Sequence, residues 1–247
     1  MVKIIKEGKT FTITDFEFVN KHNYKEFSRN DDPEGRTYNV GDDKIPSVTT
    51  ILSKTQSKEK QAGLKLWRER VGYEEAARIT NQAATRGTEM HYVLENYFTN
   101  TGYLNVTKKG TLARMMAHNI VDNLQGLSEV WGSEVSLSYK KDNIGWAGSS
   151  DLVGVYKDNP SIIDFKQSNR PKREEWVEDY YYQIAAYALA HKQVYGDITQ
   201  GLICVCTKDL VYQSFLMNAE MIAEYEEKWI ERVRRFYKNS KTSSPKV

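Results

Sequence analysis

The spacing of apolar residues along the chain changes from a helical period to a strand period and back again. Apolar side chains recur every three to four residues over about 57–71, 74–98 and 111–124, which predicts three amphipathic helices. Ser57 is the expected N-cap of the first, and Gly87 marks a candidate break in the second. The segment from about 57 to 124 is therefore predicted to be mainly helical.

From Glu129 the pattern alternates with a period of two, which is typical of strands. Three strands are predicted at 129–139, 145–156 and 161–167, with turns at 141–143 and 157–160. A helix at 173–195, strands at 198–207 and 210–217 and a closing helix at 219–238 follow. This order predicts an α/β (mixed α+β) fold with a mixed central β-sheet flanked by helices.

The N-terminal part of the chain differs from the rest because short strands and turns replace long periodic segments. Residues 10–13 alternate, 32–35 form a turn and 36–40 are a strand candidate, before a helical region opens at Ile45–Leu52. Ser47, Thr49 and Thr50 are candidate N-caps there. We therefore expect a strand/turn appendage at 1–44, one domain at 45–238 and a flexible tail at 239–247.

Composition narrows the class of protein. The chain has 247 residues, of which 40% are hydrophobic, enough for one substantial core. No apolar run is long enough to span a bilayer and no signal-peptide core is present, so an intracellular, cytoplasmic protein without membrane partners is expected. Cys204 and Cys206 alternate onto one strand face, which favours reduced thiols. Two cysteines are also too few for an iron–sulfur cluster. Gly8-Lys9-Thr10 lacks the first glycine of a phosphate loop, so no nucleotide cofactor is expected.

Positive charge is concentrated in two segments although the net charge is only +2. Residues 54–70 carry six bases and two acids, and residues 166–173 carry four bases and no acid. Such segments can follow a phosphate backbone. The alternative is an ordinary solvated surface.

The most informative polar residues interrupt the strand at 161–167. Asp164 and Lys166 alternate to the same face of this mostly apolar segment, and the preceding strand carries Asp151 in the motif Gly148-Ser-Ser-Asp151. A buried carboxylate without a partner costs roughly several kcal/mol, so Asp164 should pair with a cation or hold a metal. A structural salt bridge with Lys166 is the alternative, because an acid, any residue and a lysine recur in polar segments such as Glu7-Gly-Lys9.

Two helical segments carry further candidates. His91 and Glu95 lie four residues apart, which places imidazole and carboxylate on one helix face. A hydrogen-bonded pair without a metal is the alternative reading. On the helix after Lys166, Gln183 and Tyr187 repeat this spacing, and the Gln183 amide needs a polar partner within an apolar stripe.

In this order and approximate spacing, His91, Asp151, Asp164-Phe165-Lys166 and Gln183/Tyr187 resemble the RecB-like branch of the PD-(D/E)xK nuclease superfamily. Within that branch the chain is most similar to the mitochondrial genome-maintenance exonuclease group and its phage and bacterial relatives. The motifs that carry this similarity are Pro46–Leu52, Arg86–His91 and Ile163–Ser168. The resemblance spans roughly residues 45–190. One departure is Gln167, where relatives often carry threonine.

The resemblance implies a restriction-endonuclease-like core and cleavage of DNA, from strand ends, with Mg²⁺ or Mn²⁺ as cofactor. It implies His91, Asp151, Asp164 and the carbonyl of Phe165 as metal ligands, and Lys166 with Asp151 and Asp164 as the catalytic set. The implied substrate contacts are Gln183, Tyr187, Ser168 and Arg86. Glu95 and Glu134 are candidates for a carboxylate that orients a metal ligand or binds a second metal. The products would carry 5′-phosphate and 3′-hydroxyl ends, as in DNA repair, recombination or replication.

Three functions remain open from the sequence. The first is a metal-dependent exonuclease acting on single-stranded DNA, with a helical arch at about 47–98 over the site. The second is an endonuclease or the nuclease subunit of a recombination complex. The third is a catalytically silent nucleic-acid-binding protein, although Asp151, Asp164 and Lys166 are all present.

Overall fold

A six-stranded sheet forms the centre of the protein in a computed structural model that describes residues 3–6, 9–12, 16–99 and 110–242. Its strands are β3 (Glu17–Phe18), β7 (Leu127–Lys141), β8 (Ile144–Tyr156), β9 (Asn159–Ser168), β10 (Gln200–Thr207) and β11 (Tyr212–Met217). Their order in the sheet is β11-β10-β9-β8-β7-β3. β9 pairs with β10 and β3 with β7 in parallel, and the other pairs are antiparallel. The predicted mixed sheet is confirmed.

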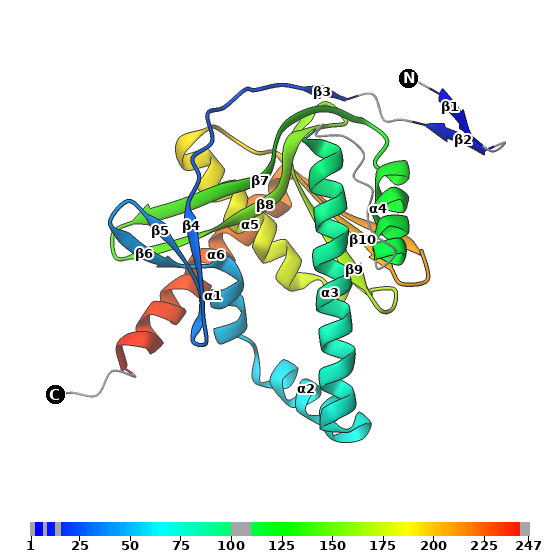
Figure 1. Ribbon diagram of the computed structural model, residues 1–247. Helices are drawn as coiled ribbons and strands as arrows, with labels where there is room; N and C mark the ends of the chain where they lie inside the picture. Colours follow the sequence, from blue (N-terminus) through cyan, green and yellow to red (C-terminus); the bar gives the residue numbers. More distant parts are fainter. Residues whose placement is uncertain (1–2, 7–8, 13–15, 100–109, 243–247) are drawn as a thin grey trace.

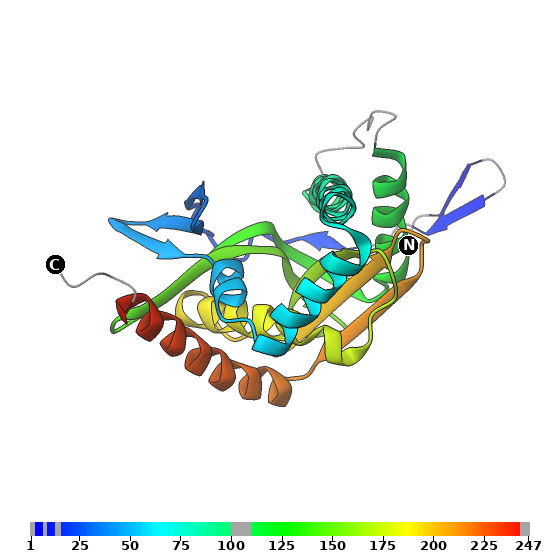
Figure 2. The same cartoon turned by 90° about the horizontal axis from the view of Figure 1, so that it is seen from below.

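Helices cover both faces of the sheet (Figure 2). These helices are α3 (Tyr73–Phe98), α4 (Thr111–Asn123), α5 (Glu178–Val194) and α6 (Ala219–Thr242). Leu94 and Met116, from α3 and α4, share one buried cluster with Ile163, whereas Ile184 and Trp229, from α5 and α6, share the other with Ile162. Neighbouring residues of β9 thus enter opposite cores, which is why this strand reads as a continuous apolar run.

The N-terminal region contributes to more than one sheet. β4 (Ser28–Asp32), β5 (Gly35–Val40) and β6 (Asp43–Pro46) form an antiparallel sheet, and β1 (Lys3–Lys6) pairs with β2 (Lys9–Thr12) in a hairpin that lies apart from the main body (Figure 1). Tyr38 and Ile45 pack against Ala147 of β8. The expected boundary at residue 44 stays a prediction, and β3 is part of the central sheet.

Local side-chain hydrogen bonds begin the first two helices. Ser47 Oγ accepts a hydrogen bond from the Thr50 amide at the start of α1 (Val48–Lys54), and Ser57 Oγ accepts one from the Lys60 amide at the start of α2 (Lys58–Val71). Both residues therefore act as the expected N-caps. α2 packs beside α3 but contains no buried residue.

Three expected boundaries differ from the structure. The break near Gly87 is wrong, because α3 is continuous and Gly87 instead allows a close approach to Gln167, whose Cγ would lie 3.3 Å from an added Cβ. The helix expected from residue 173 begins with a separate 3-10 turn, η2 (Glu174–Trp176), because buried Val177 leaves the helical conformation. α6 extends to Thr242, four residues past its expected end, and the rest of the expected tail lies outside the described residues.

Among the described helices, none combines the length and the apolar character needed to cross a bilayer.

Candidate functional site

The candidate site lies where β8 and β9 separate. Their antiparallel pairing extends from Tyr156↔Asn159 to Leu152↔Ile163 and stops there. Asp151 and Asp164 are the next residue on each strand. Beyond this point β8 continues to pair with β7, and β9 continues to pair with β10. The strands thus diverge at the two predicted carboxylates, which leaves side-chain space inside an otherwise continuous sheet.

Asp151 bridges the two strands across this gap. Its Oδ2 accepts a hydrogen bond of 2.6 Å from the Phe165 amide, a donor that β8 would satisfy if the ladder continued. Its Oδ1 lies 3.4 Å from His91 Nδ1. The carboxylate therefore links α3 to β9.

Asp164 is almost completely buried, with 1% of its surface exposed. Lys166 Nζ lies 2.5 Å from its Oδ2, which makes an ion pair by distance. Neither carboxylate oxygen, however, has a partner with hydrogen-bond geometry among the described residues. Buried polar atoms of native proteins are rarely left in this state, so the carboxylate is suited to an additional cation.

A third carboxylate joins the cluster from β7. Glu134 stands between the register pairs Ser133↔Leu152 and Val135↔Ser150, opposite Asp151, with a left-handed φ of 51°. Its Oε1 lies 3.9 Å from His91 Nδ1, and its Oε2 accepts a hydrogen bond of 2.7 Å from Ser149 Oγ. One ligand atom each of His91, Glu134 and Asp151 lies within 4.8 Å of the others.

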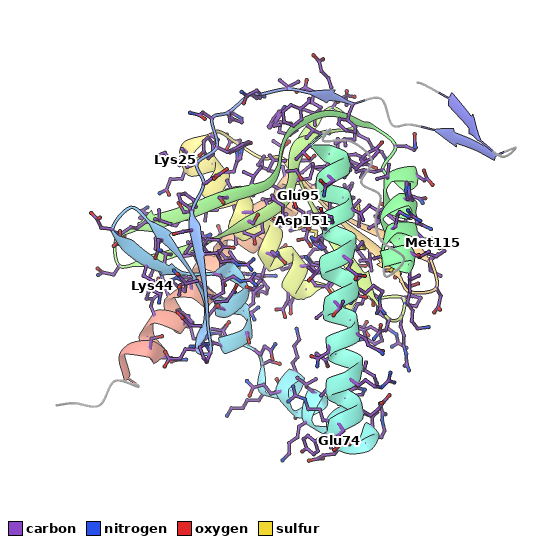
Figure 3. All side chains as sticks on the ribbon, viewed as in Figure 1. Lys25, Lys44, Glu74, Glu95, Met115 and Asp151 are labelled. Carbon is purple, nitrogen blue, oxygen red and sulfur yellow. The ribbon has the colours of Figure 1, made fainter. Side chains whose placement is uncertain are left out.

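Glu95 lies one turn after His91 on α3, and Figure 3 labels Glu95 and Asp151 near the centre of the view. Burial, and then the charge of Glu134, raises the pKa of Glu95. The structure thus brings both predicted glutamates to the same side of the site.

The charges of the cluster depend on one another. Burial lowers the pKa of His91, but Asp151 and Glu134 outweigh it and raise that pKa to about 10. Burial alone would raise the pKa of Asp151, but the charge of His91 and its hydrogen bond hold it below its ordinary value. Without a metal, the imidazolium is thus the main counter-charge of Asp151.

The two partners of the Asp164–Lys166 pair shift in the same direction. Burial raises the pKa of Asp164 to about 6, with Lys166 opposing and Asp151 adding to the rise. Burial lowers the pKa of Lys166, but Asp164 and Asp151 outweigh it and raise that pKa. At neutral pH both groups are charged, and the pair is ionised.

Gln183 and Tyr187 meet on the inner face of α5. Gln183 Nε2 lies 3.4 Å from Tyr187 Oη, and both side chains are at least nine-tenths buried. A Cβ at Gly148 would lie 2.7 Å from Tyr187 Oη, so the glycine that opens the Gly-Ser-Ser-Asp motif makes room for this phenol. Burial raises the pKa of Tyr187 well above its ordinary value, so the phenol stays protonated.

Arg86 and Ser168 lie at the far end of β9. Arg86 Nε donates to Gln167 Oε1 at 3.0 Å, and its terminal nitrogen donates to Asn169 Oδ1. Ser168 Oγ donates to the Arg170 carbonyl at 2.6 Å within a local turn. The Ser168 hydroxyl proton is therefore already engaged, and its role as a substrate contact stays a prediction.

A groove of about 920 Å³ opens beside this end of β9. α2 and α3 form one wall, and residues 167–172, η2 and Lys208 form the other. Gln167 and Tyr180 also line it, and Lys166 Nζ lies 5.4 Å from the centre of the Tyr180 ring. Through Tyr180, the groove thus comes close to the lysine of the candidate site.

The arrangement fits a hard divalent cation. Carboxylate oxygens with one imidazole are suitable ligands for Mg²⁺ or Mn²⁺. Among the described residues, Asp164 Oδ2 faces Lys166 Nζ, and Oδ1 has no hydrogen-bond donor. His91, Glu134 and Asp151 form one group of possible ligands, and Asp164 follows the last β8–β9 pair beside Asp151. The predicted ligand set of His91, Asp151 and Asp164 stays a prediction.

Sequence reasoning missed two kinds of contact. It predicted no contact for Ser149, although the hydroxyl of this residue donates a hydrogen bond to Glu134. It also left the partners of Arg86 open and named no role for Trp176, which lines the groove. The serine pair before Asp151 was the available signal for the first contact. Only the folded arrangement of α3 and β9 shows the second.

The chain is similar in sequence to known proteins. No protein-family model matches the chain. Mitochondrial genome maintenance exonuclease 1 of Homo sapiens is 26% identical over 209 residues, covering 81% of this chain and 60% of the relative. The Mus musculus protein of the same name is 27% identical over 213 residues, covering 81% and 61%. The chain therefore spans about three fifths of the length of the curated relatives it matches.

A solved structure of a candidate exonuclease from Eubacterium rectale is also similar, with a TM-score of 0.41 and 16% identity over 60% of this chain and 66% of that one. This likeness is too weak to support an inference. The sequence matches, by contrast, confirm the expected similarity: the chain resembles the mitochondrial genome-maintenance exonucleases, as its motifs predict.

Proposed function

We propose that the chain is a Mg²⁺- or Mn²⁺-dependent deoxyribonuclease of the PD-(D/E)xK superfamily that hydrolyses phosphodiester bonds from free ends of single-stranded DNA. The observation that carries the proposal is the convergence of Asp151, Asp164 and Lys166 where β8 and β9 separate. Relatives that are named exonucleases support a nuclease function. A structural ion pair alone would not require His91 and Glu134 as well.

The residues present indicate how the cation would be held. His91, Asp151, Asp164 and the Phe165 carbonyl would bind it, with Glu134 as a further carboxylate within reach. When bound, the cation supplies Lewis-acid activation of water and stabilises the charge that develops on the phosphate. Ser149 keeps the Glu134 carboxylate turned toward His91 through its hydrogen bond.

Lys166 serves the reaction as a fixed positive charge. Its raised pKa keeps the ammonium protonated, so orientation of the attacking water and neutralisation of the phosphate suit it better than proton abstraction. The water oxygen would bond to phosphorus as the bond from phosphorus to the 3′ oxygen breaks, with one water proton lost to solvent and one proton taken up by the 3′ oxygen. The fragment on the 5′ side then ends in a 3′-hydroxyl, and the fragment on the 3′ side begins with a 5′-phosphate.

Gln183, Tyr187 and Arg86 would hold the substrate. The protonated phenol of Tyr187 and the Gln183 amide lie on α5 opposite Gly148, and both offer neutral donors. Arg86 retains guanidinium hydrogens beyond those given to Gln167 and Asn169. The segment 47–98 would form the arch over the site.

The decisive test is digestion of end-labelled oligonucleotides by the wild type and by Lys166→Ala. We expect cleavage with Mg²⁺ or Mn²⁺, none with chelator, and a loss of at least about 100-fold in the variant. Lys25→Ala is the matched control, because Lys25 is an exposed lysine far from the site (Figure 3). Equal digestion by Lys166→Ala, with its fold verified by circular dichroism, contradicts the assignment.

Circular single-stranded DNA separates the alternatives in the same assay. An exonuclease leaves closed circles intact and degrades the same strand once it is cut. Cleavage of circles would favour the endonuclease or a subunit of a recombination complex. Binding with no cleavage of any substrate would favour the catalytically silent protein.

A further inference from the structure

We propose that the groove beside Lys166 is a binding track for one unpaired DNA strand, with bases stacked on Trp67 and Trp176 and phosphates held by Arg70, Arg170 and Lys172. This inference rests on the proposed function and extends it, because it assigns substrate class to residues outside the metal cluster. It also gives tasks to both basic segments of the sequence.

Two tryptophans line the groove. Trp67 comes from α2, and Trp176 comes from η2, which is distant in sequence. Trp176 is 52% exposed, although burial of an indole ring is favourable. The Arg173 guanidinium lies 5.1 Å from its ring centre. Exposed aromatic rings between cations are the surface on which bases stack in single-strand-binding proteins.

The charge of the groove is strongly unbalanced. Six of its lining residues are arginine or lysine, and Glu75 is the single acid. Arg78 is paired with Glu75, Lys208 with Asp209, and Arg86 with two amides. In the described part of the chain, no ion pair joins Arg70, Arg170 or Lys172 to an acid within 4.0 Å. These three cations are therefore available for phosphates.

Lys172 is also affected by the excess of positive charge in the groove. It is half-buried, and burial together with the nearby Lys60 charge lowers its pKa. A cation held near a second cation gains from an anionic ligand. A phosphate in the groove would supply that anion.

Hydrogen bonds fix the wall that carries these groups. The Lys172 amide donates to Gln213 Oε1 at 2.6 Å, and Gln213 Nε2 donates to the Lys172 carbonyl at 3.0 Å. The Lys208 amide donates to the Ser168 carbonyl at 2.9 Å. The segment after β9 is thereby tied to β11 and to the end of β10, and a preorganised wall loses little entropy when a ligand binds.

Stacking decides the substrate class. A duplex turns its phosphates outward and hides its base faces, so it could use the cations but not the indoles. A single strand can use both. Gln167 and Tyr180 also line the groove, and both are neighbours of Lys166, so a strand bound there would pass close to Lys166.

The test is binding of fluorescently labelled oligothymidylate, and of a duplex of equal length, measured by anisotropy in chelator so that cleavage plays no part. Trp67→Ala and Trp176→Ala should each weaken single-strand binding about 5- to 50-fold and change duplex binding little. Arg70→Gln, Arg170→Gln and Lys172→Gln should each lower the slope of log affinity against log salt by about 0.7.

Two exposed residues far from the groove provide matched controls. Phe18 is 50% exposed on β3, and Phe18→Ala should leave single-strand binding unchanged. Lys25→Gln removes one charge at a distance and should leave the salt slope unchanged. If the tryptophan variants bind oligothymidylate as tightly as Phe18→Ala, or if duplex binds as tightly as single strand, the groove assignment is overturned. Cleavage lost in Lys166→Ala would still support the nuclease, so the two failures are distinguishable.

Discussion

Single residues at the site are constrained by contacts with distant parts of the chain. Asp151 receives the amide of Phe165, Glu134 is held by Ser149, and Gly148 leaves space for Tyr187. Each of these contacts fixes the direction of a polar side chain. At such positions a small substitution should therefore affect the site more than its size suggests.

Gly148→Ala is the sharpest case. The added Cβ would lie 2.7 Å from Tyr187 Oη and 2.8 Å from Cε1, and Tyr187 is too buried to move into solvent. We expect a loss of about 1–3 kcal/mol in the free energy of unfolding, measured by urea denaturation. Cleavage should fall as the phenol is displaced.

Gly63→Ala provides the matched substitution. Gly63 lies within α2, and no atom lies within 4 Å of an added Cβ. Its replacement should raise stability by up to about 1 kcal/mol, because alanine is the better helix former. Equal effects of the two substitutions would contradict the proposed contact with Tyr187.

At the scale of elements, an aromatic cluster joins the N-terminal segment to the end of α5. Tyr24 Oη lies 3.0 Å from His191 Nε2, and His191 Nδ1 lies 2.7 Å from the Gly196 carbonyl. The ring centre of His22 lies 5.3 Å from that of His191. The segment between β3 and β4 is thus held on α5 by uncharged rings.

This cluster predicts a stability that depends on pH. Burial lowers the pKa of His191 from 6.5 to about 4, so the folded state prefers the neutral ring. Between these values the unfolded chain binds more protons, and stability is full above about pH 6.5 and falls as the pH decreases toward 4. From pH 7 to pH 5 the wild type should lose about 2 kcal/mol more than His191→Gln, measured by urea unfolding at both values.

The histidine comparison cancels the titration of residues common to both proteins. Lys21 and His22 face His191 from the N-terminal segment, and both are retained in the variant. Parallel loss of stability in wild type and His191→Gln would show that His191 is not the titrating group.

At the scale of the whole molecule, the charged residues of the candidate site, His91, Glu134 and Asp151, link α3, β7, β8 and β9. A cation that binds only the folded chain should therefore raise its melting temperature. At a concentration 100 times the dissociation constant, Mn²⁺ should contribute about 2.7 kcal/mol, or roughly 5–10 °C for a chain of this size. Differential scanning fluorimetry measures the shift without any nuclease activity.

Asp164→Asn should lose most of that shift, and Asp197→Asn should keep it. Asp197 is an exposed carboxylate paired with Lys192, away from the cluster. A shift of equal size in all three proteins would place the cation elsewhere.

The sequence pattern predicted the secondary structure and the direction of several polar side chains. The alternation of β8 and β9 predicted both strands and put Asp164 and Lys166 on one face, because side-chain direction in a strand follows from position alone. The spacing of His91 and Glu95 predicted a shared helix face for the same reason. The sequence resemblance then predicted which of these groups belong together.

The tertiary structure decided what no local period contains. It showed that β8 and β9 separate at Leu152↔Ile163, that Glu134 stands opposite Asp151, and that Gln167 and Asn169 hold Arg86. It also built one groove from α2, α3, η2 and the segment after β9. The physical reason is that apolar periodicity reports which face of an element is buried, whereas a site depends on which elements pack together and where their pairing stops.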